Sequence, residues 1–229
     1  MEKCGIVKAE DYTSFVLEPQ YDEISYVTDS QTFLVTANKK VGLFTKDGKR
    51  KIDLAYDKIT SMGQDSKLYA VETNNMHGVV DENGKIIIYP QYDQVGTDVS
   101  SFSYSNTKNG YILMNKLIPV KNGDLWAFFD TSGQKVSDGF KYQSIGCSSV
   151  KSGNNIYPLL QIPEYNVVVV SDEEGKYGFM DTTGNDAILN FLFDEMFYNR
   201  GQEDTAKCND YTLKICNDDL FVVSSNFNP

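Results

Sequence analysis

One 19-residue pattern occurs twice in the chain and constrains its fold more than any other feature. Residues 41–59 read VGLFTKDGKRKIDLAYDKI, and residues 77–95 read HGVVDENGKIIIYPQYDQV. Both copies place a glycine second, a glycine eighth and a Tyr-Asp pair near the end. Self-similarity at a period of about 20–50 residues is the sequence signature of repeat architectures. We therefore expect a series of similar small sheets rather than one irregular core.

Weaker copies extend the pattern over most of the chain. The Tyr-Asp position recurs at Tyr21-Asp22, Tyr56-Asp57, Tyr92-Asp93, Tyr142-Gln143 and Phe193-Asp194. An aromatic-glycine position follows it at Val41-Gly42, His77-Gly78, Trp126-Ala127 and Tyr177-Gly178. Six residues after each of these small residues stands a further glycine: Gly48, Gly84, Gly133 and Gly184. The constant offset predicts equivalent hairpin turns in which glycine supplies a positive φ.

Each copy reads as four short strands, and no segment keeps a 3.6-residue period, so the predicted fold is all-β. We expect a single repeat domain over 1–229, with units at about 21–55, 56–91, 92–141, 142–192 and 193–229 completed by 1–20. A five-bladed β-propeller, closed by pairing residues 14–19 with strands of 193–223, would leave no exposed sheet edge. The alternative is an open β-solenoid with terminal caps.

The succession of aromatic-Gly, an aliphatic residue, Asp, x-x-Gly-Lys, an aliphatic run and Tyr-Asp resembles the WG (or KWG) repeat of bacterial proteins. The best match is residues 77–95, whereas only Trp126 is the tryptophan that names the family, and there the glycine is Ala127. His77 and Val41 also depart from the usual aromatic residue. The resemblance implies a structural or binding role and carries no catalytic residues.

Composition excludes several classes of function. The chain is globular, with 41% hydrophobic residues, and its formal net charge of −11 disfavours nucleic acid and anionic membranes as partners. No apolar run reaches the ~18 residues of a membrane span. The first residues show no signal core, so a secreted or cell-surface protein with its signal removed and a cytoplasmic protein both stay open. Cys208 and Cys216 either close a small hairpin disulfide or remain thiols, and Cys4 is a candidate lipid-attachment cysteine.

The repeated acidic residues are candidates for chemistry, but a residue that recurs in every unit serves the unit. Asp residues before tight turns accept backbone N–H bonds, which accounts for those that precede the hairpin glycines: Asp81, Asp130 and Asp181. His77, the only histidine, occupies a position held elsewhere by aromatic residues, so no nucleophile has an evident histidine activator. We expect no metal, no cofactor and no enzymatic activity. A glycosidase with a pair of carboxylates is the least favoured reading.

The clearest functional signal is length variation between the Tyr-Asp and aromatic-glycine positions. The first two units use 20 and 21 residues there, whereas the third and fourth use 34 and 35. The extra residues, 99–116 and 147–166, are rich in Tyr, Ser and Asn, and insertions at one point of a repeat emerge on one face. They are either a binding face or, alternatively, ordinary loops or extra hairpins. The candidate binding residues are Phe102, Tyr104, Asn109, Tyr111, Asn154, Tyr157 and Tyr165.

Three functions are consistent with these features. The first is a non-enzymatic scaffold that binds a protein partner through these loops. An acidic immunity or inhibitor protein with a basic target is a specific version of it, because the negative charge would speed association. The second is a cell-surface carbohydrate-binding module, since aromatic side chains stack on sugars. The third is the glycosidase.

Overall fold

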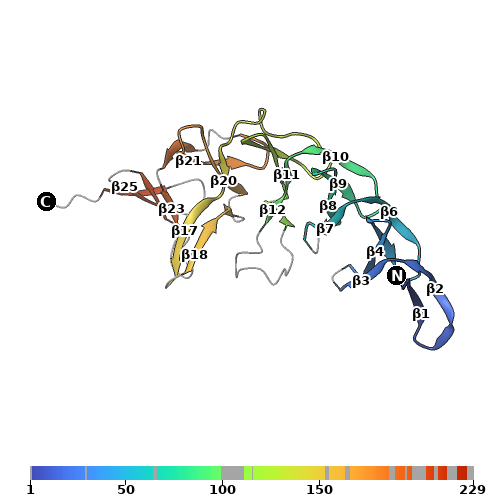
Figure 1. Cartoon of the computed structure of the whole chain (residues 1–229). Coiled ribbons are helices and arrows are strands. Elements are labelled where there is room, and N and C mark those ends of the chain that lie inside the picture. Colours follow the sequence, from blue (N-terminus) through green and yellow to red (C-terminus); the bar gives the residue numbers. More distant parts are fainter. Residues whose placement is uncertain are drawn as a thin grey trace. The chain divides into compact units, whose positions relative to one another are not determined.

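The computed structural model confirms an all-β chain (Figure 1). It describes residues 2–28, 30–63, 66–98, 111–114, 116–152, 155–162, 166–185, 189–193, 195–197, 205–208, 211–215 and 221–225. No helix occurs in these ranges, and therefore none that is long and apolar enough to cross a membrane. The chain divides into two compact units, Met1–Ile112 and Leu113–Pro229, which are described separately below.

Unit 1 contains two complete four-stranded antiparallel sheets and an N-terminal hairpin. The hairpin pairs β1 (Cys4–Lys8) with β2 (Asp11–Tyr21). The first sheet has the order β3 (Glu23–Val27), β4 (Thr32–Ala37), β5 (Lys40–Thr45), β6 (Arg50–Tyr56). The second repeats it with β7 (Lys58–Ser61), β8 (Leu68–Thr73), β9 (Met76–Asp81), β10 (Ile86–Tyr92). The short strands β11 (Gln94–Val95), β12 (Thr97–Asp98) and β13 (Tyr111–Ile112) follow.

Unit 2 repeats the same elements with longer connections. Its first sheet includes β14 (Ile118–Asn122) and β15 (Leu125–Phe129). The second runs β16 (Ser144–Ile145), β20 (Val167–Ser171), β21 (Tyr177–Asp181), β22 (Leu189–Phe193), with β19 (Gln161–Ile162) also on β20. A separate pair joins β17 (Cys147–Ser152) and β18 (Asn155–Leu159). The last sheet is β23 (Glu195–Phe197), β24 (Thr205–Cys208), β25 (Tyr211–Ile215), β26 (Phe221–Ser225).

The repeat alignment is confirmed by strand register. Five pairs of residues show the same alignment. In each, the first residue of the aromatic-glycine position, or its equivalent Cys4, is the Cα partner of the aromatic residue of a Tyr-Asp position: Cys4 with Tyr21, Val41 with Tyr56, His77 with Tyr92, Trp126 with Tyr142 and Tyr177 with Phe193. A register shift follows at the same place in each of the first three pairs. The N-terminal hairpin is therefore the second half of a unit, as the sequence predicts.

The hydrophobic core lies between successive sheets, because neighbouring residues of a strand point to opposite faces. Leu43 packs with Ile59, Tyr69 and Val80 on one side. The next residue, Phe44, packs on the other side with Leu17 and Val35. In unit 2 an equivalent cluster gathers Met114, Trp126, Phe128, Tyr142, Val168 and Met180. Burying one such side chain contributes about 1.5–3 kcal/mol, so the sheets that share these three clusters stabilise one another within their unit.

The predicted hairpin glycines have the predicted conformation and a further role. Gly48, Gly84, Gly133 and Gly184 have φ of 80°, 81°, 89° and 92°. A Cβ on Gly84 would lie 2.9 Å from the carbonyl oxygen of Lys51, three residues beyond Gly48 in the preceding copy. Gly184 approaches the carbonyl of Val136 still more closely, again three residues beyond the preceding hairpin glycine, Gly133. The glycine therefore allows one sheet to touch the backbone of the sheet before it.

The predicted closure by the chain ends is not found among the described strands. β2 pairs only with β1, and β23–β26 form a four-stranded sheet of their own. The sequence pattern predicts only three strands at the C-terminus, whereas residues 205–208 form a further strand there. This sheet consequently has four strands without residues 14–19. The closed five-bladed form stays a prediction.

Replacing Gly184 by alanine should destabilise the chain far more than the same change at Gly175. Gly175 also has a positive φ, 77°, but a Cβ added to it would meet no atom within 4 Å, so it isolates the conformational penalty. We expect a loss of about 1 kcal/mol for Gly175→Ala and about 3 kcal/mol or more for Gly184→Ala. Urea denaturation measures both. Equal losses would contradict a role in contact between sheets.

Deleting residues 1–20 should affect only unit 1. The deletion removes Leu17 from the cluster with Val35 and Phe44, so amide exchange in β4 and β5 should accelerate. Exchange in 195–225 should stay unchanged, because that sheet pairs within itself. Hydrogen-exchange mass spectrometry gives both readings in one experiment. Faster exchange in 195–225 would instead support the closed form.

Candidate functional site

The aspartates of the Tyr-Asp positions hold the turn between the second and third strands. Asp22 Oδ2 accepts a hydrogen bond from the backbone N–H of Asn38 at 2.7 Å, and Asp57 Oδ2 accepts one from Asn74 at 2.8 Å. Their other oxygens lie 2.6 Å from the Nζ atoms of Lys3 and Lys40. The lysine hydrogen bond, followed by the backbone hydrogen bond, lowers the pKa of both carboxyl groups. These carboxylates are occupied in structural roles.

The second set of aspartates closes the hairpin that contains the repeated glycine. In each case Oδ1 accepts the backbone N–H groups two and four residues further on: Asn83 and Lys85 for Asp81, Ser132 and Gln134 for Asp130, Thr183 and Asn185 for Asp181. Burial raises the pKa of Asp130, but hydrogen bonds from the Ser132 hydroxyl and from the backbone outweigh it, so the net pKa is lowered. The turn chemistry expected from the sequence is confirmed.

His77 lies in a shallow hollow of about 190 Å³, open solvent included, on the sheet β7–β10. Besides His77, the hollow is lined by Lys58, Thr60, Ala70, Val71 and Glu72. Ligand pockets usually have volumes of about 300–1,000 Å³, so this hollow is too small for a typical ligand. His77 is half-buried and stands opposite Glu72 and Tyr92 in the sheet, as a residue of the aromatic position would. Within the described ranges no three His, Cys, Asp or Glu side chains gather as a metal site.

The long connections of the third and fourth repeat units each contain an additional strand pair, and both pairs begin five residues after the aromatic residue of the Tyr-Asp position, at Thr97 and at Cys147. In the third repeat unit, β12 pairs with β13, so that Asp98 stands opposite Tyr111. In the fourth, β17 pairs with β18 from Cys147–Leu159 to Ser152–Asn155. The corresponding connections of the first two units, 28–31 and 62–67, contain no strand among their described residues. The backbone thus has the extra hairpins that the sequence leaves open as an alternative to plain loops.

The candidate binding residues fall partly within these hairpins. Tyr111 belongs to β13 and Tyr157 to β18. The others lie outside the described residues: Phe102, Tyr104, Asn109, Asn154 and Tyr165. Their assignment to a binding surface stays a prediction.

Sequence reasoning missed a set of exposed aromatic side chains in unit 1. Tyr12 is 78% exposed and Phe15 46% exposed in the N-terminal hairpin, and Tyr89 is 67% exposed on the edge strand β10. Tyr26 is also exposed, where it contacts Phe33 with ring centroids 5.2 Å apart. One signal was available: between Gly5 and Tyr21 the first copy has two residues more than the copies between Gly42 and Tyr56 or Gly78 and Tyr92. The longer hairpin carries Tyr12.

Residues 78–126 match the family described as WG containing repeat. The chain carries a WG repeat. The matched segment begins at Gly78 and ends at Trp126, so it runs from one aromatic-glycine position of the WG repeat to the next. The register pairs reported above show that other copies of the repeat, too divergent for that match, have the same strand pairing. No curated protein matches the sequence significantly.

Solved structures show only a distant likeness. A Kluyveromyces lactis Hsv2 with loop 6CD replaced by a Gly-Ser linker is 11% identical, with a TM-score of 0.37, 83% of this chain covered and 61% of that one. A eukaryotic initiation factor is 14% identical, with a TM-score of 0.40 and coverages of 87% and 51%. PorZ, a surface component of the type-IX secretion system of Porphyromonas gingivalis, is 10% identical, with a TM-score of 0.32 and coverages of 90% and 27%. This chain thus spans about three fifths of the first of these chains, and no functional argument follows from the likeness.

Asp130 offers a test of the turn chemistry. Its folded-state pKa lies below the ordinary value of 3.8, so its contribution to stability is present above that value and is lost as the pH falls through the folded-state pKa. Asp130→Ala should lower stability at pH 7 by about 1 kcal/mol. It should also flatten the fall in melting temperature between about pH 4 and pH 2. Asp130→Asn keeps an acceptor oxygen but no charge, so it should flatten the acid limb with a smaller loss at pH 7.

Proposed function

We propose that the protein is a non-enzymatic binding scaffold that engages a protein partner through the hairpins inserted in its third and fourth units. The observation that carries the proposal is that the long connections of both units contain an additional strand pair, β12–β13 and β17–β18, and that both pairs begin at the same point of the repeat. A repeat that varies at one point while its turns and glycines stay fixed resembles scaffolds that present variable segments for recognition.

The fixed residues support this division of roles. Backbone N–H groups of turns donate hydrogen bonds to five of the repeated aspartates: Asp22, Asp57, Asp81, Asp130 and Asp181. His77 stands opposite Tyr92 in its sheet, as the residue before the glycine does in the other copies. Such residues explain the fold and leave recognition to the segments that differ between units. The inserted segments contain Tyr104, Tyr111 and Tyr157, and tyrosine combines large contact area with low conformational entropy loss.

The net charge of −11 favours a basic partner. Long-range attraction accelerates association with such a partner and weakens with salt, as in an acidic inhibitor of a basic target. An association rate that falls about tenfold or more between low and high salt would agree with this version of the proposal. An association rate that does not change with salt would leave the binding-scaffold proposal standing, but it would contradict the preference for a basic partner.

Truncation of the insertions gives the direct test. A partner captured from the source organism is purified, and its affinity is measured by calorimetry for the full chain, for a variant with residues 99–110 replaced by a short Gly-Ser linker, and for Tyr157→Ala. We expect each change to weaken binding by about 2 kcal/mol or more, roughly 30-fold, with little change in melting temperature. The control is Tyr89→Ser, which removes an exposed aromatic side chain outside the insertions and should leave the affinity unchanged.

Three results would contradict the proposal. A lowered melting temperature with unchanged affinity would assign the tyrosines to packing of the hairpins. Binding on a glycan array that the same variants abolish would favour the carbohydrate-binding module. Hydrolysis of a glycan by the purified chain would favour the hypothesis that the protein is a glycosidase.

A further inference from the structure

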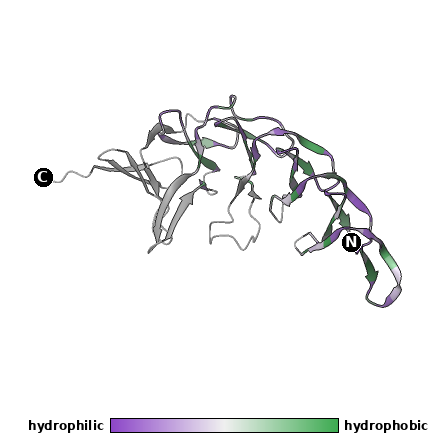
Figure 2. Cartoon of the chain, in the orientation of Figure 1, coloured by the Kyte–Doolittle hydropathy of each residue, from purple (hydrophilic) through white to green (hydrophobic). Residues whose placement is uncertain are grey.

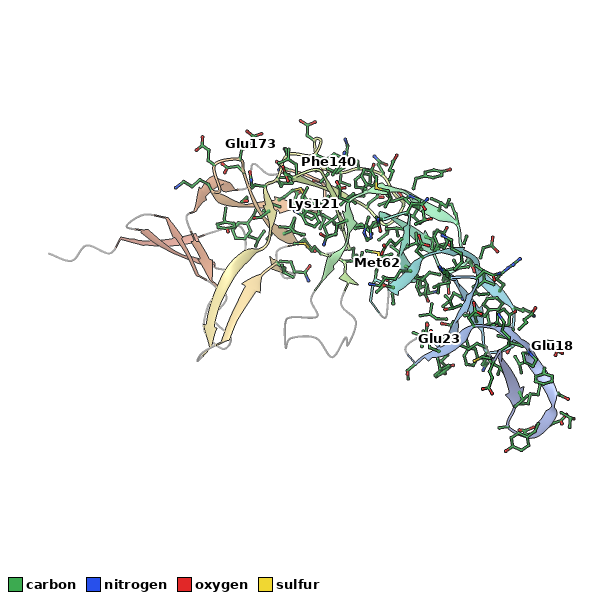
Figure 3. All side chains as sticks on the ribbon, viewed as in Figure 1. Glu18, Glu23, Met62, Lys121, Phe140 and Glu173 are labelled. Carbon is green, nitrogen blue, oxygen red and sulfur yellow. The ribbon has the colours of Figure 1, made fainter. Side chains whose placement is uncertain are left out.

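We draw no further inference here: the strongest candidate, the exposed surface of Ile86 and Tyr89 on the hydrophobic outer strand β10 (Figure 2, with side chains in Figure 3), stands where the equivalent strand β6 has an ion pair, but nothing in the structure shows what covers it.

Discussion

The structure depends on a contact between a glycine and the backbone of the preceding sheet. Gly84 lies against Lys51, and Gly184 against Val136, and in both cases the φ angle is one that other residues rarely adopt. This contact sets how closely two sheets approach, and the packing of Leu43 with Val80 across the same space follows from it. A repeat unit cannot bury both of its faces alone, and such a contact is made by Gly48, Gly84 and Gly184.

The glycine of the aromatic-glycine position has a structural role different from that of the hairpin glycine. Gly42 and Gly78 face the fourth strand of their own sheet, where the register shifts by two residues and the strand backbone comes close. On the other side of the same residue stands a buried valine of the second strand. The same position in the N-terminal hairpin, Gly5, has the fourth strand but no second strand among the described residues.

Acidic side chains illustrate why residue type is a weak guide to chemistry in repeat proteins. Asp57 is exposed and Asp81 is half-buried, and each accepts hydrogen bonds from the backbone of a particular turn. Their recurrence with the period of the repeat predicted that outcome, because a catalytic residue is needed once and a turn residue is needed in every unit. The segments that break the period, 99–116 and 147–166, are where recognition is proposed.

The sequence by itself determined the all-β class, the strand order within a unit, the positive φ of Gly48 and Gly184, and the turn role of Asp130, because these depend on contacts between residues close in the chain. Only the tertiary structure decided that residues 205–208 complete the C-terminal sheet, that Gly84 touches Lys51, and that β1 pairs with β2 alone among the described strands. These features depend on which strand pairs with which across long separations. A periodic sequence offers several partners of equal local quality, so packing makes the choice.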